Sequence, residues 1–352
     1  MKRIFFIILG LLTAVSGFSQ ANLQPAATVN LTKTEQITVG QLRIEVERME
    51  TAASEAEGAA RRLTVPERRQ VLDVMINEKL VLQAAERDRV TISENEVNQQ
   101  IQQLRGALAQ QVGRQPTDTE FAQAIRSESG LDVPTFREQL RKQMIVQKYL
   151  MSKKGDLINS IKIPTDAEIL AEYNIRRSEL VRPETIRVSM IMVPFGDGAA
   201  ARTNAKALAD RLKREIGSDP SKFDEVAQRS VTPNSGFQAG DAGYLPRNAE
   251  ARQLLGQTFI DTAFSLRQGQ VSNVIEGLQG FQIIKVTENY AIKQLELTDI
   301  MQLGTRITVR DYIGQFLLTQ RQQTILTQAS EELLKELRTN RSFQVFEDRL
   351  NW

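Results

Sequence analysis

The side chains that most often carry out catalysis at neutral pH are missing from this chain of 352 residues. The sequence contains no histidine and no cysteine. It therefore excludes an imidazole base, a Ser-His-Asp or Cys-His nucleophile and a zinc site of the usual kind. Carboxylates, lysines, tyrosines and metals bound by oxygen remain available, but no residue pattern predicts a metal site or a cofactor.

The charged side chains that are present do not form a recognisable reactive group. Adjacent pairs such as Glu78 with Lys79 and Asp88 with Arg89 have the character of solvated helix faces. The basic residues at 61–62 and 68–69 have no aromatic residues between them, so a nucleic-acid partner is not predicted.

The N-terminal segment has the features of a secretory signal. Lys2 and Arg3 precede an apolar run from Ile4 to Val15, which is shorter than the ~20 residues of a membrane span. Small residues follow, so we expect a signal peptide over 1–19 with cleavage after Ser19, or alternatively after Gly17. An uncleaved anchor is the competing interpretation.

Export without lipidation follows from the same segment. A lipoprotein needs a cysteine at its cleavage site, and the sequence has none. The segment's two basic residues account for the formal net charge of +2, so the mature chain carries no overall field towards nucleic acid or anionic membranes. We expect a protein of the bacterial periplasm that has no stable membrane span.

Capping residues and apolar spacing predict a helical N-terminal region. A capping box is a Ser or Thr followed three residues later by Glu or Gln, and it satisfies the first free N–H groups of a helix. Such boxes occur at Thr38–Gln41, Thr64–Glu67, Ser93–Glu96, Thr117–Glu120 and Thr165–Glu168, and Asp132 caps a further long helix. The strongest helix follows Thr64, and its broad apolar face is formed by Val71, Leu72, Met75, Ile76, Leu80 and Leu82.

The central part of the chain changes to a pattern of strands and helices. Residues 186–193 and 278–286 are apolar and rich in β-branched residues or methionine, which predicts two buried strands. Amphipathic segments and a glycine-rich turn lie between them, as expected of one compact αβ domain. After a short extended piece, a long helix is predicted from about Thr308 to Arg338.

This central pattern resembles the parvulin-type peptidyl-prolyl isomerase domain over Pro183 to Tyr290. The resemblance is carried, in order, by the segments IRVSMIMV at 186–193, GDAGYL at 240–245, QTFIDTAFSLRQGQVSNVI at 257–275 and GFQIIKV at 280–286. Met190 and Gln282 stand where the family usually has histidines, and Thr232 or Pro233 falls near its usual Cys or Asp.

The resemblance also implies a pocket for a proline ring or a peptide segment. Its residues would be Met190, Met192, Leu245, Leu255, Phe259 and Gln282. Leu255 and Phe259 have an alternative interpretation, in which they only pack a helix onto the sheet, and Phe264 is expected to be a core residue.

The helical region, from ITVGQLRIEV through VLDVMINEKLVLQAAERDRVTISENEV to FREQLRKQMIVQKYL, resembles the N-terminal chaperone module of SurA-type periplasmic foldases over Thr38 to Leu150. In SurA-like and PpiD-like proteins the C-terminal helix packs back on this module, and the resemblance implies the same here. The expected fold class is α+β: a helical chaperone module built from N- and C-terminal segments, with an inserted parvulin-like αβ domain that has a small antiparallel sheet flanked by helices. The expected domains are 1–19, the signal peptide; 20–176, the helical chaperone domain; 177–290, the parvulin-like domain; and 291–352, a C-terminal helical segment packed on the N-terminal module.

These features predict an exported chaperone or foldase that binds unfolded or nascent secreted and outer-membrane polypeptides. Its isomerase domain is expected to be weak or inactive, because the residues that replace the usual histidines are a thioether and an amide. One alternative is a true isomerase that works without histidine. Another is a non-catalytic structural protein of the envelope.

Overall fold

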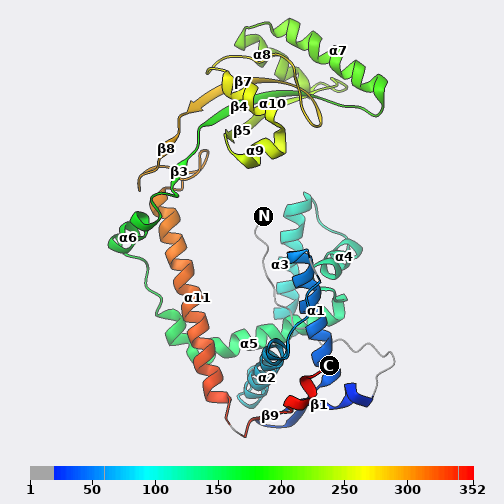
Figure 1. Cartoon of the computed structure of the whole chain (residues 1–352), viewed down its shortest axis with the longest axis vertical. Helices are drawn as coiled ribbons and strands as arrows, with labels where there is room; N and C mark the ends of the chain where they lie inside the picture. The colour runs from blue at the N-terminus through cyan, green and yellow to red at the C-terminus, as the bar shows by residue number, and fades with distance from the viewer. Residues whose placement is uncertain (1–19, 59, 340) are drawn as a thin grey trace. The chain divides into compact units, whose positions relative to one another are not determined.

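The computed structural model describes residues 20–58, 60–339 and 341–352 (Figure 1). The expected signal peptide lies outside the described residues. The chain forms two compact units, which we describe separately. The terminal unit consists of the chain up to Ile161 together with Arg321–Trp352, and the central unit is Lys162–Gln320. The predicted α+β fold, a helical module from both chain ends with an inserted αβ domain, is confirmed.

The helices of the terminal unit begin where the sequence supplies caps. They are α1 (Val39–Glu57), α2 (Val65–Arg87), α3 (Glu94–Val112), α4 (Asp118–Ser129), α5 (Val133–Asn159) and the second half of α11 (Val309–Leu337). At Thr38, for example, the side chain accepts from Gln41 N–H while Gln41 accepts from Thr38 N–H. Each box therefore satisfies two N–H groups that would otherwise have no intrahelical partner.

One apolar core joins the first two helices to the C-terminal part of the chain. Leu72, Ile76 and Leu80 of α2 are fully buried, and Leu333 and Leu337 of α11 belong to the same cluster. Lys154 of α5 adds ion pairs to Glu332 and Glu336, at 3.2 and 2.8 Å. The second half of α11 therefore packs in the same core as α1 and α2.

A small sheet in the terminal unit was only partly predicted. Its strand order is β2 (Thr34–Thr38), β1 (Pro25–Asn30), β9 (Phe343–Val345), and all its pairs are antiparallel. The stretch Ala27–Leu31 in the sequence predicts a strand, and β1 lies there, whereas β2 and β9 are only five and three residues long and give no strand pattern of their own. Pairing of β1 with β9 ties the two ends of the described chain together through main-chain hydrogen bonds.

Trp352 lies beside this sheet, between arginines of α1 and α2. The guanidinium carbon of Arg68 is 4.6 Å from the indole centroid, and that of Arg43 is 5.0 Å away. Arg68 also donates to the carbonyl oxygens of Leu350 and Trp352, at 3.1 and 2.6 Å. These contacts hold the last described residues against the N-terminal helices.

The central unit is built on a four-stranded antiparallel sheet in the order β5-β4-β7-β6. Strands β4, β5 and β7 are labelled in Figure 1. Its elements are α6 (Asp166–Arg176), β3 (Val181–Arg182), β4 (Thr185–Pro194), α7 (Ala199–Ile216), α8 (Pro220–Gln228), β5 (Gln238–Pro246), α9 (Ala249–Leu255), α10 (Gln257–Ser265), β6 (Ile275–Glu276), β7 (Gly280–Tyr290), β8 (Lys293–Gln294) and the start of α11. Both segments predicted as buried strands, β4 and β7, lie in the middle of the sheet.

Strand alternation sends apolar residues to both faces of this sheet. Ile191 and Ile283 pack with α7 and α8, and Ile186 and Ile284 pack with α9 and α10. The sheet is therefore covered by helices on each side, which explains why both central strands read as nearly continuous apolar runs.

The central unit extends beyond the expected 177–290 domain at both ends. Ile169 and Tyr173 of α6 form a small core with Val309 and Ile313 of α11, and the Tyr173 hydroxyl donates to Leu295 O at 3.1 Å. Helix α11 therefore begins in one unit and ends in the other. Within the described part of the chain, no helix is long and apolar enough to cross a membrane.

Candidate functional site

Register in the sheet places three of the predicted site residues on one face. Met190 pairs with Ile284, and Met192 pairs directly with Gln282 on the neighbouring strand. Opposite residues in antiparallel strands have Cβ atoms about 5 Å apart and point to the same side. Met190 packs on the α9–α10 side, so Met192 and Gln282 face that side too.

The other three predicted residues belong to the apolar cluster on the same side. Phe259 of α10 is 2% exposed and Leu245 of β5 is 8% exposed, whereas Leu255 and Met190 are only partly buried at the cluster's margin. Leu245 pairs with Ile186, four residues along β4 from Met190, so it lies at a different level of the sheet from Met192 and Gln282. Phe259 packs the helix onto the sheet, as does Phe264, whose ring is also covered by the Arg247 guanidinium 5.3 Å away.

Gln282 has an unusual environment for a polar side chain. It is 6% exposed, and its Oε1 atom is buried without a hydrogen-bond partner among the described residues. The amide lies flat on the turn between β6 and β7, where a Cβ on Gly277 would meet Oε1 at 2.9 Å. A buried acceptor without a hydrogen-bond partner costs free energy, so the Gln282 amide is expected to destabilise the fold at this position.

The third expected polar position lies outside the strands of the sheet. Thr232 and Pro233 lie in an exposed turn after α8, and Thr232 N–H donates to Arg229 O at 3.0 Å. The functional roles of all these residues stay predictions.

A polar network elsewhere on the sheet was missed by the sequence reasoning. Arg187 of β4 is 2.8 Å from Glu288 on β7 and 2.5 Å from Asp241 on β5. Glu288 also accepts from the hydroxyls of Tyr244, at 3.3 Å, and Tyr290. The alternation of charged residues with apolar ones in the strands is the only signal in the sequence that points to this network.

The electrostatics of this network oppose proton transfer near neutral pH. The hydrogen bonds from Arg187 lower the pKa of Asp241, and those from Tyr290 and Arg187 lower the pKa of Glu288. The bond to Glu288 raises the pKa of Tyr290 to about 12. Because a general acid or base works best with a pKa near the operating pH, these groups are suited to joining three strands and not to catalysis.

Metal chemistry has no visible site in the described residues. Across 20–58, 60–339 and 341–352, no three carboxylates gather closely enough to hold a metal ion. The sheet face itself offers the partly exposed apolar side chains of Met190, Met192 and Leu255, beside the buried amide of Gln282.

Two family models match the chain in succession. Residues 1–150 match the SurA-like N-terminal domain, and residues 173–290 match the PPIC-type PPIASE domain. The second match covers the four-stranded sheet and all six predicted site residues.

Individual relatives are similar over most of the chain. "Foldase protein PrsA" of Clostridium botulinum is 24% identical over 275 residues, which are 76% of this chain and 71% of the relative. "Chaperone SurA" of Alcanivorax borkumensis is 29% identical over 250 residues, 69% of this chain and 53% of the relative. A solved structure from work on PEB4 and Cj1289, SurA-like chaperones of Campylobacter jejuni, is 16% identical and covers 90% of this chain and 99% of its own, with a TM-score of 0.32.

The order of the two matched domains agrees with the position of the four-stranded sheet after the N-terminal helices. The chain therefore combines a SurA-like N-terminal domain with a PPIC-type peptidyl-prolyl isomerase domain.

Proposed function

We propose that this protein is an exported periplasmic chaperone of the foldase type that binds unfolded secreted and outer-membrane polypeptides. The pairing of the two domains supports this proposal, as do relatives that are named foldase and chaperone. The predicted signal peptide supports export.

The isomerase domain contributes binding and little or no catalysis. Amide resonance gives prolyl isomerisation a barrier of about 18–20 kcal/mol, and an enzyme must bind the twisted amide better than the planar one. That requires polar groups placed to follow the rotating carbonyl. Met190 supplies a thioether, and Gln282 is pressed against Gly277 with little exposed surface.

The environment of Gln282 is the observation that carries this view. A donor that assists rotation has to be accessible to the substrate carbonyl, whereas Gln282 is only 6% exposed and its amide lies against Gly277. The exposed parts of Met190, Met192 and Leu255 remain able to hold an apolar side chain through flexible contacts.

Two assays on the mature protein test the proposal. In light scattering, we expect it to suppress aggregation of an unfolded outer-membrane protein at near-stoichiometric ratios. In a protease-coupled assay with a proline-containing tetrapeptide, we expect turnover close to the uncatalysed rate. Failure to suppress aggregation contradicts the chaperone proposal and favours a purely structural envelope protein, and turnover like that of ordinary parvulins contradicts the proposed inactivity.

An active isomerase without histidine is the second candidate. This candidate is favoured by the presence of the four-stranded sheet and of apolar residues at 245, 255 and 259, where the ring pocket is expected. Isomerisation requires no proton transfer, so catalysis by an apolar pocket with one amide is chemically possible. The protease-coupled assay separates this candidate from the first.

A further inference from the structure

Strand β5 forms one edge of the four-stranded sheet. It pairs with β4 on one side only, and at nine residues it is the longest edge strand in the described part of the chain. At the other end of the sheet, β7 is covered by β6 and by main-chain bonds from residues 269–272. A long exposed edge presents N–H and C=O groups with which a strand of another molecule can pair.

The side chains of β5 do not shield its main chain. Residues 239–243 are alanine, glycine, aspartate, alanine and glycine, and Gly240, Asp241 and Ala242 are exposed. A Cβ added at Gly240 or Gly243 would meet no atom within 4 Å, so no neighbouring side chain covers these positions. Any barrier to pairing therefore has to come from the geometry and the charge of the strand itself.

The strand contains an extra residue in its middle. Residues 189 and 188 of β4 pair with Asp241 and Gly243, which leaves Ala242 without a partner on β4. Gly243 has a φ of 82°, a conformation that favours glycine. Its N–H donates to Asp241 Oδ1 at 2.9 Å. The three residues form a β-bulge, which bends a strand and increases its twist.

The bulge puts the main-chain groups of the edge out of step. On a regular strand, the groups that face outward recur every second residue, about 6.6 Å apart. The extra residue divides β5 into the stretches 238–241 and 243–246, of four residues each. The second stretch ends in Pro246, which has no N–H to donate. A straight strand can follow only one stretch, and this is shorter than most paired strands.

Arg187 holds the bulge from the neighbouring strand. Its guanidinium is 2.5 Å from Asp241 on β5 and 2.8 Å from Glu288 on β7. Strand β7 has an extra residue of its own, Thr287, at the same level of β4. The Thr287 hydroxyl donates to Arg187 O at 3.1 Å. Bulges on both neighbours of β4 therefore coincide, and one arginine spans them.

The Asp241 carboxylate adds an electrostatic barrier to the geometric one. The hydrogen bonds from Arg187 lower its pKa, so it is ionised at neutral pH, and its side chain is 47% exposed. A strand laid along β5 would remove water from this charge without bringing a charge of opposite sign, which costs free energy. Charged side chains are a common obstacle to pairing at sheet edges.

We propose that the bulge at Ala242 and the carboxylate of Asp241 keep β5 closed to further strands, so that two copies of this protein do not join through the edges of their sheets. The proposal goes beyond the chaperone function and does not depend on it. It matters most for a protein that meets unfolded chains, because such chains carry unpaired strands.

Deletion of the extra residue tests the proposal. Removal of Ala242 keeps every pair between β4 and β5, because this residue has no partner. Gly240→Cys reports contact between two edges, since a Cβ there meets no atom within 4 Å and the chain has no cysteine of its own. Asn204→Cys, at an exposed position of helix α7, is the matched control. A short bismaleimide cross-links pairs of these thiols, and light scattering after gel filtration gives the mass.

We expect the deletion to raise the yield of the cross-linked dimer at position 240 about tenfold and to increase the mass. The control at 204 should give equal, low yields with and without the deletion. A folded deletion variant with the yield and mass of the intact chain overturns the proposal. Efficient cross-linking at 240 in the intact edge overturns it as well.

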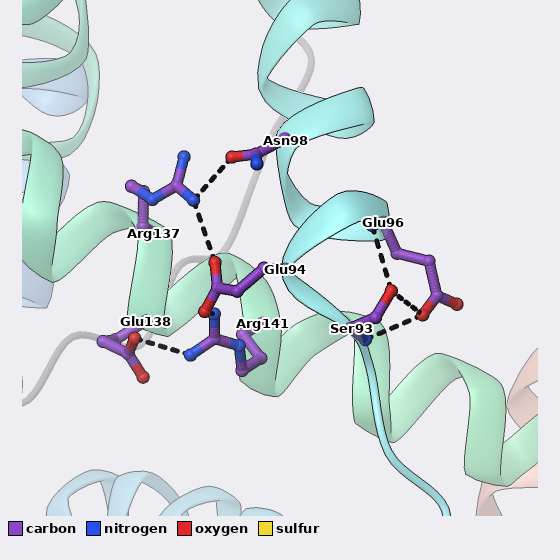
Figure 2. A network of polar contacts seen from close by, with 7 residues as sticks. All are labelled: Ser93, Glu94, Glu96, Asn98, Arg137, Glu138 and Arg141. Atoms are coloured by element: carbon purple, nitrogen blue, oxygen red, sulfur yellow. Dashed lines mark hydrogen bonds and ion pairs between the residues drawn. The ribbon is translucent and has the colours of Figure 1, made fainter.

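Loss of the charge alone is a second test, which leaves the chain length unchanged. Asp241→Thr removes the carboxylate and supplies a residue that favours strands. Glu94→Thr is the matched control. Figure 2 shows that the Glu94 carboxylate is also paired with arginines, Arg137 and Arg141 of α5, but it lies at the start of helix α3 and not on a strand.

In chains that carry Gly240→Cys, we expect Asp241→Thr to raise the dimer yield about threefold and Glu94→Thr to leave it unchanged. If the deletion variant does not fold, this pair decides, and equal yields in the two folded variants overturn the proposal. Suppression of client aggregation is a separate result. Its absence contradicts the chaperone proposal and leaves the conclusion about the edge of β5 unaffected.

Discussion

At the residue scale, the buried acceptor of Gln282 has a measurable cost. Its Oε1 atom has no partner among the described residues, and an unsatisfied buried polar group costs roughly 1–3 kcal/mol. We predict that Gln282→Leu raises the free energy of unfolding by about 1 kcal/mol and the melting temperature by about 2–4 °C. Thermal melts followed by circular dichroism of the mature protein measure this. A lower melting temperature would show that the amide has a stabilising partner.

A double replacement tests whether the lost histidines limit catalysis. We predict that Met190→His combined with Gln282→His raises prolyl-isomerase turnover at least about tenfold over the wild type, because placed hydrogen-bond donors stabilise the twisted amide. Met49→His, on α1 and outside the sheet, is the control and should leave turnover unchanged. No gain in a folded double variant would mean that burial at position 282, and not the missing histidines, limits catalysis.

The candidate site residues were predicted from family resemblance and not from chemistry. Met190 and Phe259 look in isolation like ordinary core residues, and the structure indeed buries Phe259 fully in the cluster that packs α10 on the sheet. The sequence has no signal for the position of Gln282 against Gly277, because this contact depends on the turn between β6 and β7.

At the scale of elements, the capping boxes predict an acid sensitivity. Glu67, Glu96 and Glu120 accept backbone N–H bonds at their helix starts, and together with neighbouring side chains these bonds lower each carboxyl pKa to about 2 from 4.5. The folded protein therefore binds fewer protons than the unfolded chain between these values, and stability falls as the pH drops from about 4.5 to 2. Burial raises the pKa of Glu45, which acts in the opposite direction.

Urea unfolding at pH 5 and pH 3 measures this effect. Glu67→Gln keeps a side-chain acceptor for Thr64 N–H but cannot titrate. We expect it to lose less stability than the wild type between the two pH values. An identical loss in both proteins would assign the acid sensitivity to other groups.

Helices were predicted well because their signals are local. The box at Thr38 and the cap at Asp132 each set a start that the structure reproduces. Strands β2 and β9 were missed because their stability comes from pairing with β1, a contact between residues about 300 positions apart for β9. Strands of five and three residues are too short to show a periodic pattern, so only the folded chain reveals them.

At the scale of the whole molecule, two compact units with separate cores should respond separately to damage. We predict that Trp352→Ala lowers the unfolding free energy of the terminal unit by about 1–2 kcal/mol, because it removes the ring between Arg43 and Arg68. The central unit should keep its own transition. Differential scanning calorimetry of the mature protein resolves the two.

Trp352→Phe is the control for this prediction, since it retains a ring beside the arginines and should lose less than half as much. A shift of both transitions by equal amounts would show that the units unfold as one. Stability unchanged in Trp352→Ala would show that pairing of β1 with β9 alone holds the C-terminal segment.

The indole that the two arginines enclose is the only tryptophan in the sequence. With excitation at 295 nm, emission therefore comes from one place, the seam where the last residues meet the first helices. Loss of the contacts between Trp352 and the two arginines should move the emission towards longer wavelengths, because more water then reaches the indole. The protein thus carries its own optical reporter of whether its two chain ends are joined, and peptides or clients without tryptophan can be added without obscuring it.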